Sequence, residues 1–159
     1  MSEPQEQPFD TRAAFQAQFQ ACLAASTASL QLFDPDFTVF PLGTSETDLA
    51  LRRFLGGGGV LRLAMHSPVH LERDCPRLLR LLRDYSHLVE CRITTKALRN
   101  LTDSFCIGDG IHMVRRFHSD HIRGVAVYGN DEATELQRAR FAAIWAESNP
   151  GLFPSVTGL

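Results

Sequence analysis

Helical and extended patterns alternate three times over residues 10–93, and this alternation is the feature that most constrains the fold. Each helical stretch precedes a short, largely apolar run, and the three runs cover residues 28–33, 60–65 and 88–93. Strands that alternate with helices pair in parallel through right-handed crossovers. We therefore expect an α/β fold with a largely parallel sheet flanked by helices.

Three polar residues are expected to begin the helices that precede and separate these strands. Asp10 is the expected N-cap of a helix that runs to about residue 26. Ser45 opens a second helix, because Asp48 stands three residues later, as in a capping box. Asp74 caps a third, with Pro76 in the first turn, where a missing N–H costs little.

After residue 93 the pattern changes to that of a hairpin. Gly108, Asp109 and Gly110 separate apolar runs at 105–107 and 111–114, which is a strong turn signal. A further strand is expected at 122–128, and this makes the sheet mixed.

A final helix is expected after this strand, capped by Asn130 or Asp131. Its periodicity predicts an inward face, with aromatic residues at the margins of a wide apolar arc. The predicted inward residues are Leu136, Ala143 and Ile144, and the marginal ones are Phe141 and Trp145.

Composition favours one globular unit. With 159 residues and 44% hydrophobic content, the chain can bury one sizeable core, so residues 1–9 are expected to be a flexible tail and 10–159 a single domain. The four cysteines are irregularly spaced within apolar segments, which favours reduced, buried thiols. The net charge is -2, so nucleic acid is not an expected partner.

No stretch approaches the roughly 20 apolar residues that cross a bilayer, so no membrane insertion is expected. The polar, acidic start also lacks the pattern of a secretory signal. We expect a cytoplasmic protein of bacterial type.

Residues 102–109 and the elements around them resemble the motif region of the phospholipase D-like superfamily. That motif reads His, any residue, Lys, four residues, Asp. Here Thr102 and Ser104 stand at the His and Lys positions, and only Asp109 agrees. In the family the histidine forms a covalent phosphoryl intermediate and the lysine holds the phosphate charge. The resemblance, over residues 10–148, therefore implies the fold without that catalysis.

A second part of the family signature is also missing. The family places a Gly-Ser pair and then an Asn after the hairpin turn, whereas this chain reads Arg116, Phe117, His118, Ser119. The likeness is to an uncharacterised, motif-lacking bacterial branch of the superfamily, for which no reaction is implied. Active relatives bring two motif copies together, so the single repeat found here implies a homodimer.

Asp109 has two interpretations. It either orients a catalytic partner, as its family counterpart does, or serves the turn because Asp tolerates left-handed backbone angles. Thr102 and Ser104 alternate with Asp103, so both are expected on one side of a strand.

Two other groups of residues are candidates for a relocated site. His66, Asp34 and Asp36 follow expected parallel strands and could line one crevice suited to acid–base chemistry, although Asp residues here also suit turns. A looser cluster is compatible with zinc only if a loop brings its members together; it comprises His112, His118, Asp120 and His121.

A basic stripe is expected on the third helix. Arg73, Arg77, Arg80 and Arg83 recur at helical spacing opposite leucines, and Arg115 and Arg116 could extend the patch. Such stripes are usually solvated, and the functional reading is an anion-binding face for a phosphate-containing ligand or a protein.

Two functions remain open from the sequence. The first is a non-catalytic phospholipase D-like module that acts by binding or protein interaction, without a cofactor. The second is a phosphodiester hydrolase with a relocated site, around His66, Asp34 and Asp36 or at a metal held by His112, His118, Asp120 and His121.

Overall fold

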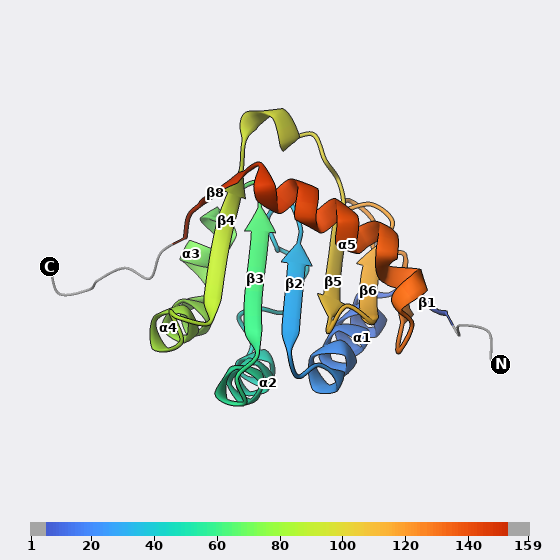
Figure 1. Ribbon diagram of the computed structural model, residues 1–159, viewed down its shortest axis with the longest axis horizontal. Coiled ribbons are helices and arrows are strands. Elements are labelled where there is room, and N and C mark those ends of the chain that lie inside the picture. Colours follow the sequence, from blue (N-terminus) through green and yellow to red (C-terminus); the bar gives the residue numbers. More distant parts are fainter. Residues whose placement is uncertain (1–5, 153–159) are drawn as a thin grey trace, which may run out of the picture.

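The computed structural model describes residues 6–152, which form one mixed sheet with helices on both faces (Figure 1). Eight strands are found within these residues: β1 (Gln7–Phe9), β2 (Ser29–Phe33), β3 (Val60–Met65), β4 (Val89–Thr94), β5 (Ser104–Gly108), β6 (His112–Arg116), β7 (Gly124–Val127) and β8 (Ser148–Pro150). The helices are α1 (Arg12–Ala25), α2 (Ser45–Gly56), α3 (Val69–Asp74), α4 (Pro76–Asp84) and α5 (Asp131–Ala146), with a 3₁₀ turn η1 (Lys96–Leu98).

The strands lie in the order β1-β7-β6-β5-β2-β3-β4-β8. Pairing is parallel between β2 and β3 and between β3 and β4, which are connected through α2 and through α3 and α4. The other five neighbouring pairs are antiparallel. The expected mixed α/β sheet is confirmed, but the expectation that it is largely parallel is wrong, because only the three strands predicted by the helix–strand alternation pair in parallel.

Two apolar clusters fill the two faces of the sheet. The larger contains Leu32 and Leu63 of the central strands and packs against α1, α2, α3 and α4. The smaller contains Phe33 and Phe105 and packs against α5, which crosses the opposite face obliquely (Figure 1).

Three predicted helix caps are each wrong by one residue. Thr11, not Asp10, caps α1, because its side chain accepts a hydrogen bond from the backbone N–H of Ala14. Thr44, not Ser45, caps α2 in the same way. Asp74 is the last residue of α3 rather than the cap of the next helix, since the chain turns at Cys75 before α4 begins at Pro76.

Asn130 is confirmed as the N-cap of α5, but the buried face of the helix differs from the prediction. Leu136 is 71% exposed and Ala143 is also exposed. The buried side chains are those of Thr134, Phe141, Ile144 and Trp145. The helix is rotated toward its aromatic residues, because Phe141 stacks on Trp145 and also contacts Phe105 of the sheet.

The last residues of the predicted flexible tail, 1–9, belong to the sheet. Residues 1–5 lie outside the described residues, but Gln7–Phe9 form β1 and pair antiparallel with β7. Phe9 is buried against Phe15 of α1, so this short strand is tied to the core.

No helix among residues 6–152 is long and apolar enough to cross a membrane.

Candidate functional site

The candidate site lies at one end of the sheet, where β2 finishes, β5 begins and β6 finishes. Ser104 pairs with Arg116 across the hairpin, and Phe105 pairs with Phe33 of β2. Asp34 directly follows Phe33, so Asp34, Ser104 and Arg116 meet at this end. We call it the motif end, because Ser104 occupies a position of the degenerate motif.

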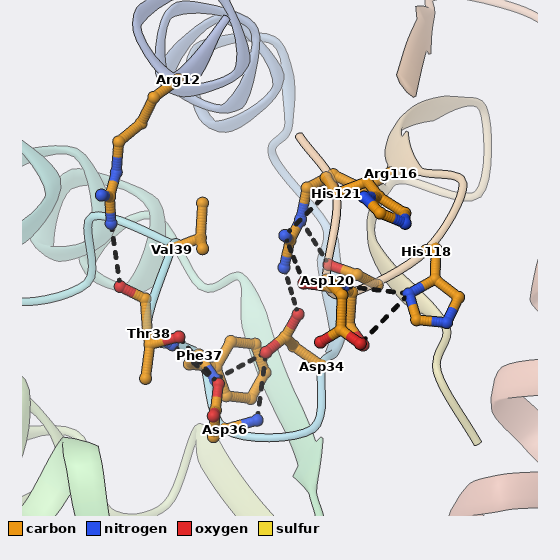
Figure 2. Close-up of polar contacts among 12 residues, drawn as sticks. Arg12, Asp34, Asp36, Phe37, Thr38, Val39, Arg116, His118, Asp120 and His121 are labelled. Carbon is orange, nitrogen blue, oxygen red and sulfur yellow. Dashed lines mark hydrogen bonds and ion pairs between the residues drawn. The ribbon is translucent and has the colours of Figure 1, made fainter. Parts of the chain in front are cut away.

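A buried ion pair is the centre of the motif end (Figure 2). Nη2 of Arg116 lies 2.8 Å from Oδ1 of Asp34, and the two side chains are 2% and 1% exposed. The same guanidinium donates to Ser104 Oγ at 3.2 Å and to the backbone oxygens of Ser119 and His121 at 2.7 and 3.3 Å. Its donors therefore point to acceptors within the protein.

The second carboxylate oxygen of Asp34 is also engaged. It accepts hydrogen bonds from the backbone N–H groups of Asp36 and Phe37, at 3.0 and 2.7 Å. Phe37 is fully buried and has a φ of 62°, an uncommon angle for a bulky residue. The loop after β2 is thus folded around this carboxylate.

Opposing influences act on the pKa of Asp34. Burial raises it, while the hydrogen bonds from Ser104, Phe37 and Asp36 and the charge of Arg116 lower it, and the net pKa is above its ordinary value.

His66 lies at the same end but belongs to a separate network. Its Nε2 is 2.8 Å from the carbonyl oxygen of Leu101, and its Nδ1 is 2.6 Å from Thr94 Oγ1. A carbonyl only accepts, so Nε2 carries the proton, and the Thr94 hydroxyl donates to Nδ1 when the ring is neutral. Both ring nitrogens are therefore occupied.

The sequence predicted a crevice lined by His66, Asp34 and Asp36. The three residues lie at the same end of the sheet, but the His66 ring does not contact either carboxylate. The backbone N–H of His66 donates to Pro35 at 2.9 Å, which places the three residues close in the fold. However, Asp36 accepts from the backbone and hydroxyl of Thr38, and within residues 6–152 no hydrogen bond joins the His66 ring to either carboxylate.

Thr102 and Ser104 are in different environments. Ser104 is the buried first residue of β5, whereas Thr102 is exposed and precedes the strand. The expectation that both lie on one side of a strand is therefore wrong, because β5 begins two residues later than that expectation requires.

Asp109 has the geometry of a turn residue. It has a φ of 55° beside Gly110 at 72°, at the opposite end of the sheet from Ser104 and Arg116. Its carboxylate accepts from the backbone N–H groups of Thr27, Ala28 and Ser29. These contacts fix the loop before β2.

The histidine cluster is divided between the two ends of β6. His118 and His121 lie in the loop after β6, with ring centroids 5.4 Å apart, and Asp120 is 3.8 Å from His118. His112 begins β6 and accepts from the N–H of Gly129. Within the described residues, no three His, Cys, Asp or Glu side chains are placed to hold a metal ion.

The arginine stripe is divided between two helices. Arg73 is on α3, and Arg77, Arg80 and Arg83 are on α4, all exposed. Arg77 donates to the carbonyl of Gly43 at 3.2 Å, so part of the stripe holds a neighbouring loop.

The motif end opens to solvent beside Arg116. An open hollow of about 320 Å³ adjoins it, lined by residues at the start of α1, in the loop after β2 and in the loop after β6, among them Arg12, Val39 and His121 (Figure 2).

Sequence reasoning missed the role of Arg116. A signal was present, because alternation along β6 places Arg116 on the same face as buried Val114. A charge on a buried face requires a partner, and Asp34 supplies it.

Comparison with known proteins gives a family and a fold. A family model described as "Domain of unknown function (DUF7931)" matches residues 11–152. No curated protein matches the chain.

Among solved structures, Nuc from Salmonella typhimurium, described as a phospholipase D family member, has a TM-score of 0.66 and 12% identity and covers 94% of this chain and 99% of its own. NucT from Helicobacter pylori has a TM-score of 0.68 and 8% identity, over 94% of this chain and 100% of its own. TrmBL2, described as an archaeal chromatin protein with a novel mode of DNA binding, has a TM-score of 0.69 and 10% identity, over 92% of this chain and 54% of its own. The phospholipase D-like fold is confirmed.

Proposed function

The chain belongs to this family of unknown function on a phospholipase D-like fold, and from that premise we propose that it is a cytoplasmic binding module without catalysis at the motif end. The observation that carries the proposal is the closed ion pair of Asp34 and Arg116, which lies beside the motif position held by Ser104.

Phosphoryl transfer needs a nucleophile and a free positive charge for the phosphate. Thr102 and Ser104 have hydroxyls in place of imidazole and ammonium. The nearby charge of Arg116 is already neutralised by Asp34, and the guanidinium also donates hydrogen bonds to the Ser104 hydroxyl and to the backbone oxygens of Ser119 and His121. A phosphate would have to displace a buried carboxylate, which costs far more than binding at an exposed arginine.

His66 is a poor replacement nucleophile for a related reason. Both ring nitrogens are hydrogen-bonded, so attack through either one requires loss of the contact to Thr94 or to Leu101. Neither Asp34 nor Asp36 stands beside the ring as a partner.

Binding is proposed to occur through the exposed surface. The exposed arginines Arg73, Arg77 and Arg80 suit a protein partner or a phosphate-containing ligand. TrmBL2 is described as binding DNA, but the net charge of -2 favours other partners for this chain. The resemblance to relatives in which two motif copies meet supports a homodimer as one such protein partner.

A phosphodiesterase assay tests the absence of catalysis. Purified protein is incubated with bis(p-nitrophenyl) phosphate, with and without added Zn²⁺, beside the His66→Ala and His118→Ala variants. We expect equal, background release of nitrophenol in all three. Turnover that disappears in either variant would instead establish the hydrolase with a relocated site.

Two binding measurements test the positive part of the proposal. Sedimentation velocity at micromolar concentration is expected to give a dimer. Retention on heparin, used as a polyanion probe, is expected to fall in an Arg77→Ala, Arg80→Ala double variant and to be unchanged in His66→Ala. A monomer with no arginine-dependent retention would count against the binding module.

A further inference from the structure

A second cluster of reactive side chains lies at the junction of α3 and α4, away from the motif end. Cys75 is the single residue between the two helices. Its Sγ is 3.9 Å from Nε2 of His70, which lies five residues earlier on α3. Nδ1 of the same ring is 3.1 Å from Oδ2 of Asp74. Thiol, imidazole and carboxylate therefore stand in a row.

The carboxylate determines which ring nitrogen of the neutral histidine can accept a proton. Oδ2 of ionised Asp74 only accepts, so Nδ1 of His70 carries the hydrogen of that contact. Nε2 then presents its lone pair to the Cys75 thiol. This is the arrangement by which a base activates a nucleophile while a third group orients the base.

Such a base is needed because the thiolate is not abundant on its own. Burial and the neighbouring Asp74 carboxylate raise the pKa of the Cys75 thiol. Cys75 also occupies the N-cap position of α4, where its Sγ makes no capping hydrogen bond and the helix dipole favours negative charge. Transfer of the proton to His70 would relieve the cost of ionisation at the sulfur.

The surroundings of the thiol restrict what can react with it. Cys75 is 3% exposed, and Gly43 lies against its sulfur. A Cβ added to Gly43 would lie only 3.2 Å from Sγ of Cys75. Arg77 holds Gly43 in place by donating to its carbonyl. A large substrate is excluded, and the Asp74 carboxylate disfavours an anionic one.

We propose that Cys75 is a site of covalent modification by small, uncharged peroxides such as hydrogen peroxide. In this reaction His70 is the base and Asp74 is the positioning residue. The thiol proton moves to Nε2 of His70, and the sulfur attacks one peroxide oxygen. The O–O bond breaks, and the leaving hydroxide takes the proton from His70 to form water. Sulfur is oxidised to a sulfenic acid and the peroxide is reduced.

The other three cysteines lack this arrangement. Cys22 and Cys106 are fully buried and face each other at 3.9 Å between their sulfurs. Burial, with a smaller contribution from Glu90, raises the pKa of Cys91 to about 12. A high thiol pKa without an adjacent base makes a cysteine unreactive.

Peroxide labelling of the full chain tests the proposal. Native protein is exposed to hydrogen peroxide for increasing times, the peroxide is removed with catalase, and the protein is then unfolded in urea that contains dimedone and mapped by mass spectrometry, so that the label reaches every sulfenic acid regardless of its burial. We expect label first at Cys75, and a rate lower by about tenfold or more in His70→Ala. His87→Ala, a change at an exposed histidine, is the matched control and is expected to label like the native protein.

The pH profile separates a base from a merely structural residue. In native protein the labelling rate is expected to level off at a lower pH than in His70→Ala, in which only ionisation of the thiol itself supplies the thiolate. Asp74→Asn keeps the imidazole but loosens its orientation, so Cys75 in this variant is expected to label at an intermediate rate. This variant replaces His70→Ala in the test if His70→Ala does not fold. The proposal is overturned if Cys75 labels no faster than Cys22 and Cys106, or if neither variant changes the rate or its pH profile.

Discussion

Asp109 shows, at the scale of single residues, how one side chain serves two elements. Its left-handed backbone makes the turn between β5 and β6, and its carboxylate binds the N–H groups before β2. Partial burial tends to raise its pKa, but the hydrogen bonds from Ser29, Ala28 and Thr27 outweigh this, and the net pKa is lowered.

A lowered pKa in the folded state means that the ionised carboxylate stabilises the protein. We expect Asp109→Asn to reduce the free energy of unfolding by about 1 kcal/mol at neutral pH, since Asn tolerates the backbone angle but loses the charge. The difference should be complete above the carboxyl's unfolded pKa of about 3.9 and should vanish as the pH falls through the lower folded value.

Urea denaturation from pH 7 to pH 2 measures this difference. Asp120→Asn is the control, because its side chain is 82% exposed and is expected to change stability by less than about 0.5 kcal/mol. A cost for Asp109→Asn that is independent of pH would mean that the charge plays no part.

At the scale of elements, the start of α1 is decided by a single hydroxyl. Thr11 accepts from Ala14 N–H at 3.1 Å, and Asp10 stands one residue too early to do so. We expect Thr11→Ala to cost about 1 kcal/mol of unfolding free energy and Asp10→Ala much less, as measured by urea denaturation. Equal costs, or a larger cost at Asp10, would contradict the assignment.

Elements with strong local patterns were predictable from the sequence. The apolar strand at residues 60–65 and the Gly108-Asp109-Gly110 turn needed no knowledge of distant contacts. Cap positions were not predictable to the residue, because Asp10 and Thr11 are both good caps and the fit of the first turn decides between them. β1 was missed because three residues carry no periodicity and pair only when β7 is present.

The candidate sites were predictable only in part. Helix–strand order placed Asp34 and His66 at one end of the sheet, but Asp34 and Arg116 are 82 residues apart and no local pattern joins them. Cys75 and His70 are near neighbours in the chain, yet their contact depends on the break between α3 and α4, which the sequence interpretation placed one residue too early, with Asp74 as the cap.

At the scale of the whole molecule, the Asp34–Arg116 pair connects two parts of the sheet. Asp34 follows β2, which begins the parallel strands, and Arg116 ends β6 in the antiparallel part, with β5 between them. We propose that this pair maintains the fold and takes no part in chemistry. A charge kept for catalysis often costs stability, so its removal leaves the protein equally or more stable.

The unfolding free energy of Arg116→Met, measured by urea denaturation at pH 7, separates a structural ion pair from a catalytic one. Arg115→Met on the same strand is the matched control, because Arg115 is only half-buried and lies over the exposed ring of Phe117. We expect Arg116→Met to lose about 3–5 kcal/mol, because it leaves the buried Asp34 carboxylate without its partner, and the control to lose much less. An Arg116→Met protein as stable as the native one, or more stable, would contradict the structural role of the pair.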